Sequence, residues 1–128
     1  MQLFNTRGHK LRQFTPLHPD SVRMYSCGPT VYNHAHIGNL SSYIYADILR
    51  RTLRQCFGTT KHVMNITDVD DKTIRDSLAK YPDRPPRQAL QRLTDHYQQI
   101  FLDEMRAVGN SIDDITLVKA TDSIAEIQ

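Results

Sequence analysis

Apolar and polar positions along the chain predict alternating strands and helices. A short β-type run over 22–27 stops at Gly28. From 38 to 57 the apolar residues recur every three or four positions, which is typical of an amphipathic helix. The run over 59–66 is again β-type. Strand, helix and strand in this order predict a parallel βαβ unit with a right-handed crossover.

The helix predicted over 38–57 has further signals near its end. Arg50, Arg51 and Arg54 place cations where they oppose the helix dipole, and a glycine follows as a typical stop. Cys56 also falls in the apolar stripe, so we expect it to be buried as a small hydrophobic residue. The stripe itself consists of Leu40, Ile44, Tyr45, Ile48, Leu49, Leu53 and Phe57.

The second half of the chain has helical periodicity. Helices are predicted over 71–80 and 87–108, with three prolines between them, and a further helix start lies near Ser123. The predicted fold class is therefore α/β, with an incomplete, Rossmann-like parallel sheet and a helical second half.

We expect one domain over 1–128, with the βαβ unit in 1–70 and the helical segment in 71–128. Two strands leave a sheet edge without a partner, whereas parallel sheets are normally larger and covered on both faces. The helix start close to the last residue points the same way. The chain is therefore expected to be part of a longer protein, and a complete small protein with a frayed end is the alternative.

Composition and charge narrow the class of protein. Hydrophobic residues make up 39% and charged residues 23% of the 128 residues, as in globular domains. Residues 1–64 carry 8 Lys and Arg against 2 Asp and Glu, which suits a polyanion such as ATP or nucleic acid, although solvated surface charge explains it equally well. No apolar run has the length of a membrane helix, and two cysteines do not make a secreted disulfide scaffold, so a cytoplasmic location without a membrane is expected.

The loop between the first strand and its helix carries the candidate chemistry. His34 and His36 lie just before a helix N-terminus, whose free N–H groups attract anions. Imidazole N–H donors there can stabilise the charge that gathers on an α-phosphate during nucleotidyl transfer, and Gly38 leaves room for a flat base. Taken alone, the two histidines are better explained as polar loop residues at a helix entry.

Two longer motifs make the interpretation specific. CGPTVYNHAHIGN at 27–39, followed by NITDVDDK at 65–72, resembles the cysteinyl-tRNA synthetases, which are class I aminoacyl-tRNA synthetases. FNT at 4–6 and KAT at 119–121 resemble the same family, so the likeness runs through almost the whole chain. It implies ATP-dependent activation of cysteine to cysteinyl-adenylate and transfer to tRNA(Cys), with ATP, cysteine and tRNA(Cys) as partners.

The resemblance also implies a site for the amino acid. Cys27 matches the first zinc ligand of the family, where Zn²⁺ would hold the thiolate of the substrate in preference to the hydroxyl of serine. Gly28, Thr30 and Thr67 match positions of the cysteine pocket. The other zinc ligands and the KMSKS lysines of the family would follow this sequence. Since a zinc site needs three or four ligands, Cys27 supplies only one of them.

The ATP site is implied by the family's HIGH signature. Its four positions correspond to His36, Ile37, Gly38 and Asn39, and His34 lies beside them as a further ATP-binding candidate. His36 and Asn39 are the expected catalytic residues, with Asn39 as a variant of the last position.

Three carboxylates match the family's acidic loop, namely Asp68, Asp70 and Asp71, for which helix N-capping is the plain alternative. One departure concerns the residues after Asn39. Leu40 and Ser41 stand where the family usually has alanine and arginine, which removes a cation near the ATP site.

The sequence is compatible with more than one function. If the chain is the N-terminal part of a ligase catalytic domain, it is expected to have little activity alone and to need the missing remainder of the synthetase as a partner. A truncated, non-catalytic paralogue that binds nucleotide, tRNA or a protein is the alternative. A ligase that joins cysteine to an amino sugar is not separable from the tRNA ligase by these residues. A small single-domain nucleotidyltransferase is rejected, because the last third has no second phosphate-clamping motif.

Overall fold

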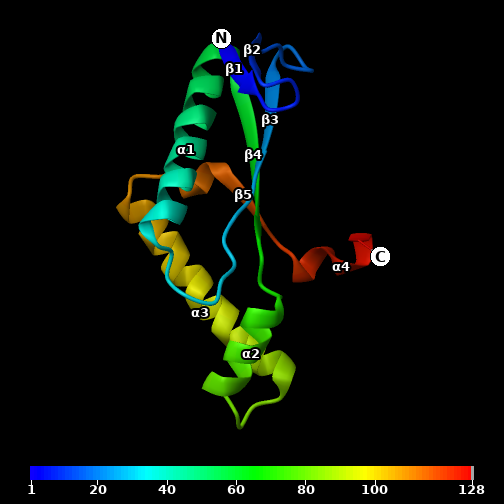
Figure 1. Cartoon of the computed structure of the whole chain (residues 1–128), viewed down its shortest axis with the longest axis vertical. Coiled ribbons are helices and arrows are strands. Elements are labelled where there is room, and N and C mark those ends of the chain that lie inside the picture. The colour runs from blue at the N-terminus through cyan, green and yellow to red at the C-terminus, as the bar shows by residue number, and fades with distance from the viewer. Residues whose placement is uncertain (128) are drawn as a thin grey trace.

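The computed structural model, which describes residues 1–127, is an α/β fold built on a three-stranded parallel sheet (Figure 1). Its strands are β3 (Ser21–Ser26), β4 (Thr59–Ile66) and β5 (Ile115–Lys119), in the order β3-β4-β5. Helix α1 (Ile37–Phe57) connects β3 to β4, so the predicted βαβ unit is confirmed. The predicted fold class is confirmed with it.

The second half of the chain, which was predicted to be helical, also contains strand β5. Helix α3 (Pro86–Ala107) and the short helix η1 (Ile112–Asp114) lead from the end of helix α2 (Asp71–Lys80) to β5, which pairs with β4 over five residues. After β5, the amide of Ala120 donates to the carbonyl of Ile66 at 2.9 Å. The ends of β4 and β5 are therefore held together beside the loops that follow them.

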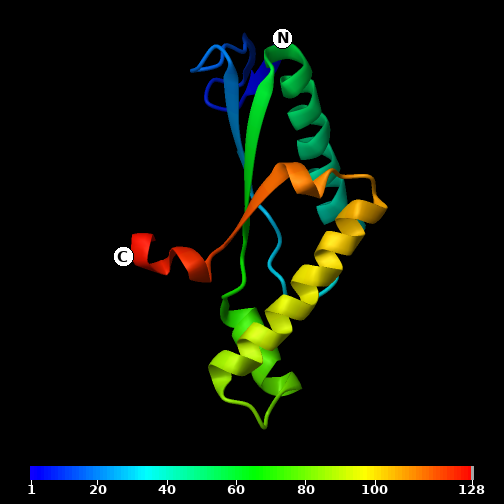
Figure 2. The same ribbon diagram turned by 180° about the vertical axis from the view of Figure 1, so that it is seen from behind.

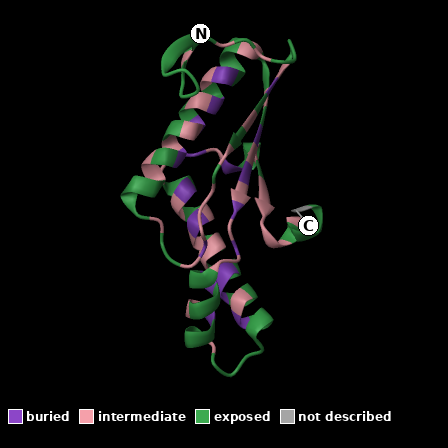
Figure 3. Cartoon of the chain, turned by 45° about the vertical axis from the view of Figure 1, so that its right-hand side comes forward, coloured by how far each residue is buried: buried purple, intermediate pink, exposed green. Residues whose placement is uncertain are grey.

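Helices α1 and α3 pack on the same face of the sheet, as Figures 1 and 2 show. Both connections run from one strand to the next in the same direction, and right-handed crossovers then place both helices on one side. The core between them contains Tyr43 of α1, Met64 and Ile66 of β4, and Phe101 and Met105 of α3. The Tyr43 and Phe101 rings meet edge to face, with centroids 5.2 Å apart. Buried positions concentrate along these facing surfaces (Figure 3).

Two hairpins extend the molecule at opposite ends (Figure 1). At one end, β1 (Gln2–Asn5) and β2 (Lys10–Gln13) form an antiparallel pair with mostly exposed residues. At the other end, α2 (Asp71–Lys80) packs against α3. The chain continues past β5 through η2 (Thr121–Ser123) into α4 (Ile124–Ile127). None of the helices in the described residues has both the length and the apolar character to cross a membrane.

The inner face of α1 differs from the predicted apolar stripe. Tyr45 and Ile48 are 71% and 55% exposed, and a buried ion pair takes part of their expected place. The prediction that Cys56 is buried is wrong, because the inward positions near the end of α1 are Leu53, which is buried, and Phe57, which is partly buried, whereas Cys56 is exposed. The buried residues of α1 are Tyr43, Asp47, Arg50 and Leu53.

The buried ion pair joins α1 to the connection before β5. Arg50 pairs with Asp47 three residues earlier and with Asp114 at 2.9 Å, while Arg51 contacts the second oxygen of Asp47 at 2.6 Å. Burial alone would raise the pKa of Asp47, and the hydrogen bonds from Arg50 and Arg51 outweigh it, so this pKa lies below its ordinary value. The arginines predicted only to oppose the helix dipole therefore fasten two elements together.

His62 lies on β4 and contacts the last residue of β3. Its side chain is buried, and Nε2 lies 2.8 Å from Oγ of Ser26. Burial, followed by the nearby charge of Arg50, lowers the pKa of His62, so the ring is neutral at pH 7. This contact fixes the last residue of β3, immediately before Cys27.

Candidate functional site

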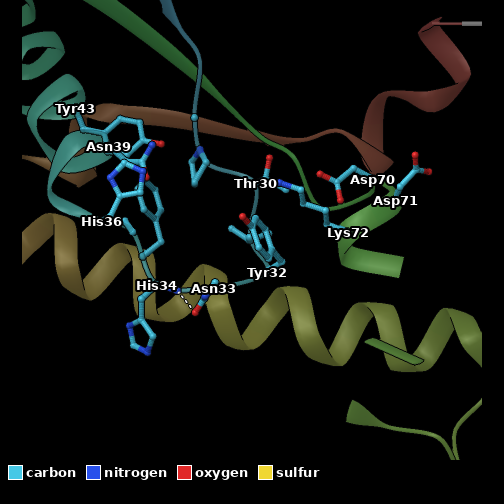
Figure 4. Close-up of a pocket in the computed structure, with 15 residues that line it drawn as sticks. Thr30, Tyr32, Asn33, His34, His36, Asn39, Tyr43, Asp70, Asp71 and Lys72 are labelled. Carbon is cyan, nitrogen blue, oxygen red and sulfur yellow. Dashed lines mark hydrogen bonds between the residues drawn. The ribbon is translucent and has the colours of Figure 1, made fainter. Parts of the chain in front are cut away.

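A cavity of about 710 Å³ lies beyond the carboxyl ends of β3 and β4 (Figure 4). The loop after β3, the first turns of α1 and α2, and one residue of α3 line it. In open parallel sheets, ligands bind at this edge because the loops and helix N-termini face it. The position of the cavity is therefore the one that the βαβ unit predicted.

The loop after β3 is held against the end of β4 by backbone pairing. The amide of Val31 donates to the carbonyl of Thr67 at 3.1 Å, and the amide of Thr67 donates to the carbonyl of Pro29 at 2.9 Å. Thr30 and Thr67 thereby form an isolated parallel bridge. The two threonines assigned to a cysteine pocket are thus neighbours, although only Thr30 lines the cavity.

Gly28 is required by the closeness of β4. A Cβ at this position would lie 1.8 Å from the carbonyl oxygen of Asn65 and 2.9 Å from Cγ of Met64. No side chain fits there. Gly28 does line the cavity, but its first role is to let two backbones approach.

Asn65 organises this junction and was not singled out in the sequence. Its Oδ1 accepts from the amide of Gly28 at 3.1 Å and from the hydroxyl of Tyr25 at 2.9 Å, and its Nδ2 donates to Oγ1 of Thr67 at 3.2 Å. The only signal for it was its place at the start of the NITDVDDK motif. Asn65 positions the two segments that carry the candidate pocket.

His36 is the N-cap of α1. Its Nδ1 accepts from the amide of Gly38 at 3.1 Å, and its carbonyl accepts from the amides of Asn39 and Leu40. A neutral ring that accepts at Nδ1 carries its proton on Nε2. His36 therefore offers one N–H donor beside a helix N-terminus, next to Asn39 and Tyr43 (Figure 4).

Gly38 leaves room for the His36 ring. A Cβ on Gly38 would lie 3.0 Å from Cε1 and 3.1 Å from Nδ1 of His36. The space that the sequence suggested for a nucleotide base is therefore used in part by the capping imidazole. Ile37 is 77% exposed, and neither Ile37 nor Gly38 lines the cavity.

His34 lines the same cavity but is directed towards α3. Its Nδ1 lies 2.8 Å from Oε1 of Glu104, and its ring meets that of Tyr97 edge to face. The second oxygen of Glu104 accepts from the amide of Ala35 at 3.2 Å. Figure 4 shows the His34 ring turned away from His36. The two histidines therefore occupy different surroundings.

Cys27 is exposed and directly precedes Gly28 in the chain, but it is not one of the residues that line the cavity. Burial raises the pKa of Tyr43, which lines the cavity. Within residues 1–127, no group of three or more His, Cys, Asp and Glu side chains is arranged to hold a metal ion. The described residues alone thus do not fit a zinc site.

The acidic loop has mainly structural contacts. Asp68 is buried and accepts from both the amide and the hydroxyl of Thr121. Asp70 caps α2 and exchanges hydrogen bonds with Thr73, as the capping alternative predicted. Asp71 is exposed in the first turn of α2 and lines the cavity. One of the three carboxylates thus anchors the KAT segment and another caps a helix.

Lys72 and Tyr32 form the far wall of the cavity. The Lys72 ammonium lies 5.5 Å from the centroid of the Tyr32 ring. Among the lining residues described, Lys72 alone carries a permanent positive charge. Neither residue was predicted, and nor was Phe101 of α3, because only the tertiary fold brings these segments together.

The fold and the site together define a parallel α/β domain with a cavity at the carboxyl edge of its sheet. A family model described as the catalytic domain of class I (C) tRNA synthetases matches residues 13–128. The cysteine–tRNA ligase of Koribacter versatilis is 43% identical over 127 residues, which is 99% of this chain and 24% of that protein.

Two further relatives are also cysteine–tRNA ligases. The cysteine–tRNA ligase of Leptospira interrogans is 39% identical over 127 residues, covering 99% of this chain and 26% of that protein. That of Rhodopseudomonas palustris strain BisA53 is 46% identical over 112 residues, covering 85% and 24%. The chain belongs to the family of class I (C) tRNA synthetase catalytic domains, and it spans about a quarter of the length of these relatives.

Proposed function

We propose that this chain contributes the nucleotide and amino-acid side of the active site of a cytoplasmic cysteine–tRNA ligase. The observation that supports this most strongly is His36, which caps α1 through Nδ1 and offers Nε2–H beside the cavity. In the activation step, a carboxylate oxygen of cysteine attacks the α-phosphorus of ATP. The bond to the bridging oxygen breaks, and pyrophosphate leaves. In the second step, a ribose hydroxyl of tRNA(Cys) attacks the carbonyl carbon of the cysteinyl-adenylate and loses its proton, and AMP leaves.

In this proposal the residues of the chain act by position and charge. His36 Nε2–H donates to an α-phosphate oxygen, where negative charge increases during attack, and the Asn39 amide is a second donor. The N-terminal end of α1 adds a partial positive charge. Thr30, which lines the cavity, is assigned to the amino-acid pocket, and Cys27 would be a thiolate ligand of zinc, for which the described residues supply no further set of ligands.

His34 is assigned a smaller part in binding ATP. Its ring nitrogen is already engaged by Glu104 and is directed away from His36. No observation in the described residues favours the non-catalytic alternative.

Calorimetric titration of ATP into the 128-residue chain tests the nucleotide site. We expect His36→Asn to lower the affinity about tenfold or more, because a hydrogen bond to a charged group is lost. Asparagine keeps an acceptor that can cap α1, so the helix end is preserved. The matched control is His34→Asn, which should change the affinity less than threefold because that ring faces Glu104. Equal losses in the two variants would contradict the assignment of His36.

A further inference from the structure

A chain of ring and cation contacts leads from the tip of the α2–α3 hairpin to the cavity. The guanidinium of Arg92 lies 5.5 Å from the centroid of the Tyr81 ring. The Lys80 ammonium lies 5.8 Å from the Tyr81 ring and 5.1 Å from the ring of Tyr97. Tyr97 meets the His34 ring at 6.0 Å, and His34 lines the cavity. We call these five residues the ring–cation track.

The cations of the track are available to a ligand. Lys80 and Arg92 are exposed, and in the described residues neither lies within ion-pair distance of a carboxylate. By contrast, Arg50 and Lys119 are each engaged by aspartates. Exposed cations beside partly exposed rings are held by weak contacts only, which a stronger anion can replace.

The chemistry of the track fits one kind of partner, a single-stranded end of RNA. Proteins bind such strands by combining cations, which follow the phosphates, with aromatic rings, on which the bases stack. From Arg92 to Phe101 at the cavity wall, α3 rises about 14 Å, so the track follows this helix towards the cavity. An acidic peptide would use the cations but would gain little from the rings.

We propose that the ring–cation track binds the single-stranded 3′ end of an RNA and directs it into the cavity. The inference rests on the proposed function, in which the 3′ terminal ribose must reach the activated amino acid. It identifies the α2–α3 hairpin as the surface along which that end approaches the cavity.

Fluorescence anisotropy with a labelled tRNA(Cys) transcript tests this on the 128-residue chain. The test variant is Lys80→Gln/Arg92→Gln, and the control variant is Arg7→Gln/Arg12→Gln, which removes two exposed cations from the hairpin at the opposite end (Figure 1). The test variant should lower the slope of log affinity against log salt by about 1.4, and the control should leave it unchanged. Tyr81→Leu should weaken binding about fivefold or more, since a stacked base is lost.

Two further probes define the partner. A transcript without its single-stranded 3′ end should bind the wild-type chain about fivefold more weakly and should not respond to Tyr81→Leu. The proposal is overturned if this shortened transcript binds equally well, if the control pair has the effect of the test pair, or if the wild-type chain binds neither transcript. A polyglutamate peptide that binds as tightly, with the same response to the variants, would overturn it in favour of an acidic protein.

The outcome is separable from that of the nucleotide site. ATP binding that depends on His36, without binding of the RNA end, refutes the track alone. Binding of the RNA end that depends on Tyr81, without ATP binding, refutes the nucleotide site and leaves the track supported.

Discussion

Gly28→Ala is expected to lower the free energy of unfolding by about 3 kcal/mol or more. The new methyl group would lie 1.8 Å from the carbonyl oxygen of Asn65, and backbone cannot move aside as a flexible side chain can. Relief of this clash must separate the loop from β4 and break the hydrogen bond from the Gly28 amide to Asn65 Oδ1. Urea unfolding followed by circular dichroism measures the change.

Gly8→Ala is the matched control for this prediction. The nearest atom to a Cβ there is Nη2 of Arg12 at 3.5 Å, an ordinary contact at an exposed turn. Its unfolding free energy should change by no more than about 0.5 kcal/mol. If Gly28→Ala were as stable as Gly8→Ala, the tight junction of the loop with β4 would be refuted. Because stability is affected first, loss of cysteine binding in Gly28→Ala would not by itself locate the amino-acid pocket.

Asp47→Ala is expected to destabilise the fold by about 3 kcal/mol. Arg50 is only 2% exposed, and without Asp47 its buried charge keeps only Asp114 and the carbonyl of Ser111 as partners. The double variant Asp47→Leu/Arg50→Met should recover most of the loss, because an apolar pair leaves no buried charge unpaired. Thermal and urea unfolding of the single and double variants measure this coupling.

An exposed pair with the same spacing serves as the control. Asp103 and Arg106 form an ion pair at 3.1 Å on the surface of α3, where solvent screens the charges. Asp103→Ala should lower the unfolding free energy by no more than about 1 kcal/mol. A loss in Asp47→Ala no larger than in Asp103→Ala would show that the buried pair does not hold α1 to the connection before β5.

The sequence predicted best those elements whose signals are local. The bounds of β4 and α2 agree with the predictions to the residue, since each element is marked by its own periodicity and flanking residues. Strand β5 was missed because its five residues are a strand only through pairing with β4. The β1–β2 hairpin was missed because its mostly exposed positions show no alternation of buried and exposed residues.

In the candidate site, too, only the features with local signals could be predicted from the sequence. Residues of one continuous motif, such as Thr30, His36 and Asn39, were predicted to lie together, and they line one cavity. The contact of His34 with Glu104 joins positions 70 residues apart, so no local pattern could reveal it. The burial of Arg50 could not be predicted either, because a charged residue is expected to be exposed unless its partners on other elements are known.

If His36 caps α1 through Nδ1, its Nε2 carries the proton that is offered to a nucleotide. Long-range ¹H–¹⁵N spectra of the histidine side chains, recorded with and without ATP, can detect both features. We expect the His36 ring to carry its proton on Nε2, and ATP to shift that nitrogen while His96, which does not line the cavity, stays unchanged. A proton found on Nδ1, or ¹⁵N signals of His36 that saturating ATP leaves unchanged, would refute the assignment of His36 to the nucleotide site.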